Sequence, residues 1–143
     1  MHQDKRGDFT FDDLPLGAKF RQQYVIGEDV YQRFLDIFGD ASPLHVDDRV
    51  AVSCGFSAKL MHGAILNGFI SNFVGMNFTG KRTLELGVQI NFVKPTYVGD
   101  VLDLEAEVKE RLESRRVVVL QFRFLRDATM VANGRVTVMI CDL

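Results

Sequence analysis

The second half of the chain alternates apolar with polar residues, which is the pattern of strands that bury one face of a sheet. The alternation covers four segments, residues 84–92, 102–109, 118–124 and 136–140, and predicts four antiparallel strands. In the first segment the apolar positions that should share one face are Leu84, Leu86, Val88, Ile90 and Phe92. Gly134 is expected to form a bulge or a turn beside the last strand.

The first half of the chain passes from a strand pattern to helical spacing. Residues 17–26 mix apolar and polar side chains and are expected to form a first strand. A short helix should follow from Glu28 and Asp29, because acidic residues suit the positive N-terminal end of a helix. Gly39 is well placed to end this helix, and a second short helix is expected at residues 48–54.

Residues 60–78 form the most apolar long segment, and a long helix is expected from about residue 61 to residue 78. At helical spacing, its apolar side chains cover more than one face, and a helix that is apolar nearly all round is buried. The order of elements is strand, short helices, one buried helix and four antiparallel strands. This order predicts an α+β domain in which an antiparallel sheet wraps around a central buried helix.

Length and composition indicate one domain of ordinary character. The 143 residues, 47% of them hydrophobic, suffice for a single core. The net charge of −2 leaves no basic face for nucleic acid, and the polar residues within 61–78 argue against a membrane span. Cys54 and Cys141 fit neither a disulfide framework nor a metal spacing. We therefore expect a cytoplasmic protein with a flexible N-terminus at residues 1–12 and one domain at residues 13–143.

The candidate chemistry lies between the first two predicted helices. Asp40 and His45 are five residues apart, on a segment that is expected to be a loop stiffened by Pro43. A carboxylate and an imidazole held together can share one water molecule, the carboxylate accepting a proton and the imidazole exchanging one. Such a pair suits the addition of water to a polarised double bond, or its removal. Taken alone, the spacing also fits an Asp that caps a turn and a His in a loop.

The residues around this pair resemble the MaoC-like family, and in particular its (R)-specific enoyl-CoA hydratases. The family motif runs Gly-Asp-x-Asn-Pro-aliphatic-His-x-Asp, and residues 39–47 match it except that Ser42 stands where the family usually carries Asn. The resemblance spans roughly residues 13–138. It includes His62-Gly63, at the start of the apolar helix, and a Phe-x-Lys-Pro-x-x-x-Gly-Asp segment at residues 92–100. It gives the expected architecture its name, the hot dog fold.

The resemblance implies a lyase of fatty acid metabolism that hydrates trans-2-enoyl thioesters and dehydrates (R)-3-hydroxyacyl thioesters. Asp40 and His45 would act on the water, and the backbone N–H at Gly63 would stabilise the enolate oxygen. Ser42 and Ser71 would contact the substrate. The expected substrate is an acyl-CoA or an acyl carrier protein (ACP) thioester, with no cofactor and no metal. The resemblance also implies a homodimer with active sites near the subunit interface.

Several alternatives stay open on the sequence alone. Ser71 fits an active-site lining and a bond back to its own helix equally well. Gly63 can also serve close helix packing, and we expect a structural role for His62. A hot dog thioesterase would use Asp40 to activate water for attack on the carbonyl, although the nearby His45 favours a hydratase. A non-catalytic acyl-binding or assembly protein, which would retain the fold without the activity, is a second alternative.

Overall fold

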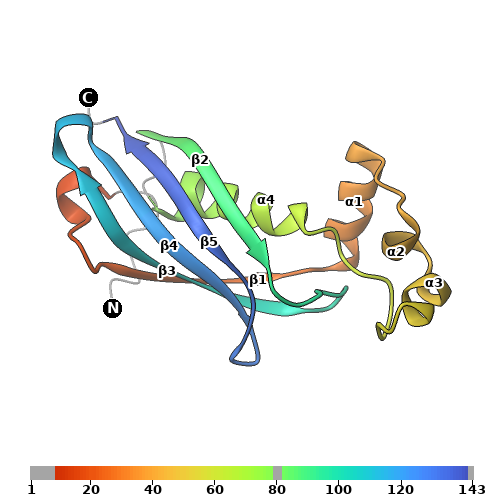
Figure 1. Ribbon diagram of the computed structural model, residues 1–143. Coiled ribbons are helices and arrows are strands. Elements are labelled where there is room, and N and C mark those ends of the chain that lie inside the picture. Colours follow the sequence, from red (N-terminus) through yellow and green to blue (C-terminus); the bar gives the residue numbers. More distant parts are fainter. Residues whose placement is uncertain (1–8, 79–81, 142–143) are drawn as a thin grey trace.

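The structure, a computed structural model, describes residues 9–78 and 82–141. Its largest element is one antiparallel sheet with the strand order β1-β3-β4-β5-β2. The strands are β1 (Lys19–Val25), β2 (Thr83–Phe92), β3 (Val101–Leu112), β4 (Val117–Arg126) and β5 (Thr129–Ile140). Each overlaps a segment predicted as a strand, although β5 begins at Thr129, seven residues before the predicted start at residue 136. The strands β1 and β2 form the two edges (Figure 1).

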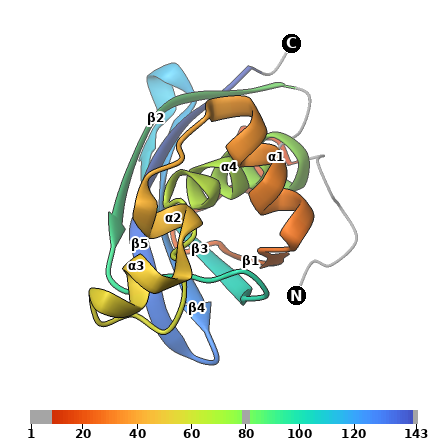
Figure 2. The same cartoon turned by 90° about the vertical axis from the view of Figure 1, so that its right-hand side faces the viewer.

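The helices occupy two places around the sheet. The group α1 (Glu28–Phe38), α2 (Pro43–Val46) and α3 (Asp48–Ser53) gathers beyond one end of the strands, while α4 (Ala64–Asn72) runs inside the curve of the sheet (Figures 1 and 2). A π-helical turn, Phe73–Phe78, continues α4, and short 3-10 turns lie at Phe11–Asp13 and Glu113–Arg115. The predicted α+β arrangement of a sheet wrapped around a helix is confirmed.

Local sequence signals account for the ends of the short helices. Gly39 ends α1 in the left-handed conformation, with φ 66°, and its N–H donates to the carbonyl of Leu35. Asp47 caps α3 by accepting from the N–H of Arg49, and hydrogen bonds from Arg49 hold the pKa of the Asp47 carboxyl below its usual value. The segment predicted as a loop instead contains α2, because Pro43 suits the first position of a helix.

The central helix is shorter and less buried than its sequence predicts. It begins at Ala64 and becomes π-helical at Phe73. Ile65, Leu66 and Ile70 are buried against the sheet, whereas the opposite face is exposed. The sheet therefore covers one side of α4 only, and the prediction of a helix buried all round is wrong for this chain by itself.

The first half of β2 departs from the alternation, because a register shift lies between Glu85 and Gly87. Glu85 pairs with Val138 and Gly87 pairs with Thr137, so Leu86 is the extra residue of a β-bulge. Glu85 therefore shares the face of buried Val138, and burial raises the pKa of its carboxyl. Leu84 and Leu86, each 51% exposed, do not join that face as predicted.

Gly134 forms neither a turn nor a bulge, so that prediction is wrong. It lies within β5, between Phe122 of β4 and Ile90 of β2. A Cβ atom at this position would come within 1.9 Å of the Gln89 carbonyl oxygen. Glycine is required here because the neighbouring backbone approaches too closely for any side chain.

The predicted flexible N-terminus falls mainly on residues 1–8, which lie outside the described residues. Within its remaining part, Phe11 is buried and Phe9 packs against the core. Cys54 and Cys141 are free and exposed. Among the helices of residues 9–78 and 82–141, none is long and apolar enough to cross a membrane.

Candidate active site

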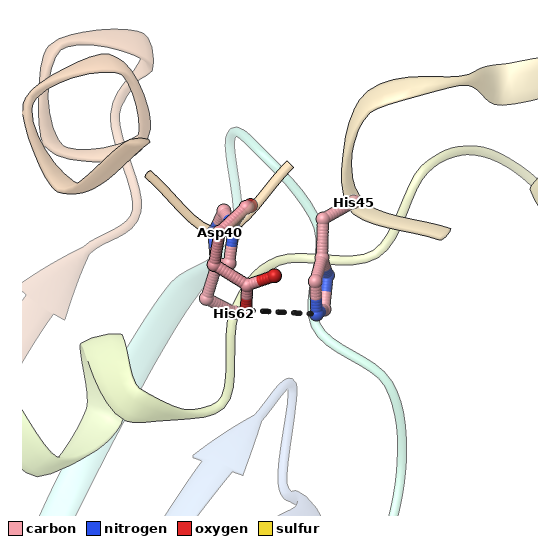
Figure 3. A group of neighbouring side chains, drawn as sticks. All are labelled: Asp40, His45 and His62. Atoms are coloured by element: carbon pink, nitrogen blue, oxygen red, sulfur yellow. Dashed lines mark hydrogen bonds and ion pairs between the residues drawn. The ribbon is translucent and has the colours of Figure 1, made fainter. Parts of the chain in front are cut away.

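Asp40 and His45 meet at the end of the molecule where α1 turns into α2. Asp40 follows the glycine that ends α1, and His45 lies on the single turn of α2. The Oδ2 atom of Asp40 is 4.0 Å from Nε2 of His45, as drawn in Figure 3. The Asp40 side chain is 52% exposed and that of His45 is 22% exposed. The two groups predicted from sequence therefore face one another at a partly open site.

Backbone contacts fix the orientation of His45. Its Nδ1 lies 2.8 Å from the carbonyl oxygen of Leu60. A carbonyl can only accept a hydrogen bond, so we assign the proton of the neutral ring to Nδ1. The lone pair of Nε2 then points toward Asp40. Tyr31 adds a second restraint, because its hydroxyl donates to the His45 carbonyl at 2.8 Å.

His62 contacts both candidate groups, Asp40 and His45. It is almost fully buried, at 2% exposure, and its Nε2 donates to the backbone carbonyl of Asp40 at 2.7 Å. Its ring packs against His45, with 4.2 Å between ring centroids, and against Phe34 at 4.6 Å. The structural role expected for His62 is therefore a specific one, since it braces both the Asp40 peptide and the His45 ring.

Gly63 stands at the N-terminal boundary of α4. It is the N-cap of that helix, and the N–H groups at a helix start have no partner within the helix. The ring of Phe92 lies directly over it, because an added Cβ atom would come within 2.6 Å of the ring. A glycine is thus needed here for close approach, and the position fits the predicted oxyanion donor.

The two serines differ in their relation to the pair. Ser42 is the N-cap of α2, and its backbone N–H donates to Asp40 Oδ1 at 3.3 Å, so it contacts the site directly. Ser71 lies on the exposed face of α4, about 12 Å along the helix from Gly63 at the usual rise per residue. Ser71 therefore lies on the same helix as Gly63, the candidate oxyanion donor, but about two turns further along it.

The side chains of Asp40, His45 and His62 each offer a possible metal ligand, and these atoms lie within 4.8 Å of one another. Their arrangement does not suit a metal ion. Nε2 of His62 and Nδ1 of His45 already face backbone carbonyls. The two rings are also tilted at 33° to one another and pack closely, with 4.2 Å between their centroids. The cluster fits proton exchange better.

Some contributors to this site carry no sequence signal. The Leu60 carbonyl that orients His45 is a backbone group, and any residue type could supply it. Tyr31 belongs to the apolar stripe of α1 and is 4% exposed, so its pattern indicates core packing alone. One weak signal was present: Tyr31 lies on the helix that leads directly to Asp40, and this position could have suggested a hydroxyl near the site.

The MaoC-like domain model matches residues 15–124, more than three quarters of the chain. The chain belongs to the MaoC-like family. All the candidate residues, Asp40, Ser42, His45, Gly63 and Ser71, lie inside the matched region. The fold is accordingly the hot dog fold of MaoC-like proteins.

Curated relatives cover nearly the whole chain. It is 28% identical over 128 residues to an (R)-specific enoyl-CoA hydratase from Aeromonas caviae, covering 89% of this chain and 96% of the relative. It is 24% identical to a mitochondrial 3-hydroxyacyl-[acyl-carrier-protein] dehydratase from Arabidopsis thaliana, covering 91% and 80%.

Solved structures agree with the MaoC-like assignment. An R-hydratase from Pseudomonas aeruginosa superposes with a TM-score of 0.85 at 27% identity, covering 95% of this chain and 88% of that one. The (R)-hydratase from A. caviae, described as involved in PHA biosynthesis, gives a TM-score of 0.81 at 27% identity, covering 90% and 98%.

Proposed function

We propose that this MaoC-like protein hydrates trans-2-enoyl thioesters and, in the reverse direction, dehydrates (R)-3-hydroxyacyl thioesters. The observation that carries the proposal is the orientation of His45, whose Nε2 faces the Asp40 carboxylate while Nδ1 is held by Leu60. The relatives named as (R)-specific hydratases and dehydratases support the same reaction.

The 4.0 Å separation of Asp40 Oδ2 and His45 Nε2 suits one bridging water. A water at about 2.8 Å from both atoms would span them at an angle of about 90°, with one hydrogen toward each. Both atoms can accept, so the pair orients the water and takes its proton. The water oxygen then bonds to C3, the C2–C3 double bond becomes single, and the pair returns one proton to C2.

Negative charge develops on the thioester oxygen during this addition. The N–H at Gly63, at the start of α4, would donate to that oxygen. A preorganised donor of this kind typically contributes about 3–4 kcal/mol to the stability of the transition state. His62 precedes Gly63 in the chain and braces Asp40, so the donor and the acid–base pair are tied to one another.

We also infer that the protein acts as a homodimer in the cytoplasm. Support for the dimer comes from β2, an edge strand whose Leu84, Leu86 and Phe92 are more than half exposed. Phe92 covers Gly63, so a second copy along this edge would also border the site. Light scattering at micromolar concentration should give twice the chain mass of 16.2 kDa, and a monomer would contradict the inference.

Incubation with crotonyl-CoA tests the proposed reaction. Loss of the enoyl absorbance without release of free thiol is the expected result. Release of free thiol would indicate a thioesterase instead, and no change in either signal on any enoyl thioester would indicate a binding protein. Parallel assays with enoyl-CoA and enoyl-ACP substrates of increasing length then identify the carrier and the acyl chain.

A further inference from the structure

The segment between β2 and β3, residues 93–100, packs next to the residues that precede α4. Its Thr96 carbonyl accepts the N–H of Met61 at 2.8 Å, and both residues are buried, at 5% and 4% exposure. Met61 immediately precedes His62 and Gly63. The position of Thr96 therefore bears on the backbone that carries the proposed oxyanion donor.

This segment has no regular secondary structure of its own, so specific contacts must hold it. At one end, the N–H groups of Val93 and Lys94 both donate to the carbonyl of Val131. At the other end, Gly99 donates to the carbonyl of Ile26 at 2.7 Å. Between these ends, the bond from Met61 joins Thr96 to the start of α4, so a side-chain restraint on the neighbouring Pro95 would hold both segments together.

Arg126, the last residue of β4, supplies that restraint. Its Nη1 donates to the Pro95 carbonyl at 3.1 Å and pairs with Asp100 Oδ2 at 2.5 Å. The same Asp100 oxygen accepts the N–H of Tyr97 at 2.9 Å. One guanidinium thus joins the start of the segment to its end.

The burial of this pair makes the loss of one partner more costly than it would be for an ordinary surface ion pair. The side chains of Arg126 and Asp100 are only 25% and 15% exposed, whereas fully exposed pairs contribute little. Each partner also bonds to the backbone, so removing Arg126 would take one donor from the Pro95 carbonyl and leave the largely buried Asp100 carboxylate with the Tyr97 N–H but without its cation.

We propose that Arg126 is a positioning residue for the hydration reaction, acting through Pro95, Thr96 and Met61 on the placement of the Gly63 N–H. This inference rests on the proposed function. It gives a role to Pro95, Gly99 and Asp100 of the 92–100 motif, whose hydrogen bonds hold this segment. A misplacement of about 1 Å at a reacting group can cost about 100-fold in rate.

Arg126→Met tests the proposal, with Arg123→Met as the matched control. Arg123 lies on the same strand and pairs with Glu105 at 2.7 Å, but on the outer face of the sheet, and its side chain is 57% exposed. Arg126→Met should lower kcat about 10- to 100-fold with KM changed less than about threefold, because substrate contacts stay intact. Arg123→Met should leave both constants near their wild-type values.

Hydrogen–deuterium exchange at the Met61 amide is the second readout, and it does not depend on activity. Exchange should accelerate in Arg126→Met and stay at the wild-type rate in Arg123→Met. If Arg126→Met does not fold, Asp100→Asn provides the same comparison, because it removes the charge of the pair and keeps the shape. A folded variant with wild-type kcat and wild-type exchange at Met61 would overturn the proposal.

The two hypotheses fail in different ways. If the wild-type protein turns over no enoyl thioester, the proposed function is wrong, and exchange at Met61 still decides whether Arg126 holds this backbone. If the wild type is active and both kcat and exchange are unchanged in Arg126→Met, the hydratase stands and the positioning role falls.

Discussion

The buried imidazole of His62 donates a 2.7 Å hydrogen bond to the backbone carbonyl of Asp40, 22 residues away in the chain. The same ring packs against His45, with 4.2 Å between centroids. One side chain at the entry to α4 thus sets the peptide of the candidate carboxylate and the plane of the candidate imidazole.

Replacing His62 should therefore reduce turnover more than substrate binding. His62→Leu removes both the donor and the ring, and kcat should fall about 10- to 100-fold with KM little changed. His62→Gln keeps an amide N–H near the position of Nε2 and should recover part of the loss. Steady-state kinetics of both folded variants checks this, and equal kcat values for Gln and Leu would argue against the hydrogen bond to Asp40.

Gly63→Ala should impair the reaction by disturbing the oxyanion position. The added Cβ atom would lie 2.6 Å from the Phe92 ring, which must then move. We expect kcat to fall at least 10-fold, toward the 10²–10³-fold loss typical of a missing oxyanion donor.

Gly68→Ala is the matched control, on the same helix. An ideal Cβ at Gly68 meets nothing within 4 Å, so this change should stabilise the protein by about 0.4–1 kcal/mol with little change in crotonyl-CoA hydration. Kinetics and thermal melts of both variants decide the matter. Normal kcat in a folded Gly63→Ala protein would remove Gly63 from the mechanism.

The ionised carboxyl of Glu85 should lower the stability of the folded protein at neutral pH but not at acidic pH. Burial raises the pKa of its carboxyl in the folded protein, so the protonated form is favoured there. The stability linked to this group is full below the unfolded pKa and is lost as the pH rises through the folded pKa. Glu85→Gln should therefore raise the Tm by a few degrees at pH 7, with the gain vanishing near pH 4. A gain that is the same at both pH values would contradict burial of the charge.

The sequence predicted the strands and the closeness of Asp40 to His45, because the signals for both are local. Gly39 ends α1, and the motif residues Asp40 and His45 meet as expected. The exposed Leu84 and Leu86 could not be predicted, because the bulge that displaces them depends on the register against β5. The need for glycine at position 134 also comes from a neighbouring strand, through the Gln89 carbonyl.

Ser42 offers a test of how the Asp40–His45 segment is braced. It occupies the N-cap position of α2 without a side-chain capping hydrogen bond, and its backbone N–H donates to Asp40 Oδ1 at 3.3 Å. Asn is also a favoured N-cap, with more hydrogen-bonding groups, so Ser42→Asn should leave kcat/KM equal or higher on short and long enoyl thioesters alike. A reversal of preference between the two lengths would show instead that Ser42 shapes the acyl pocket.

The central claim is that Asp40 and His45 act together on one water. Hydration of crotonyl-CoA at saturating concentration, followed for the wild type, Asp40→Asn and His45→Ala, tests it most directly. Each substitution should lower kcat by about 10²–10⁴-fold, the usual contribution of general acid–base catalysis, while the circular dichroism spectrum stays unchanged. Near-normal kcat in either folded variant would contradict the account.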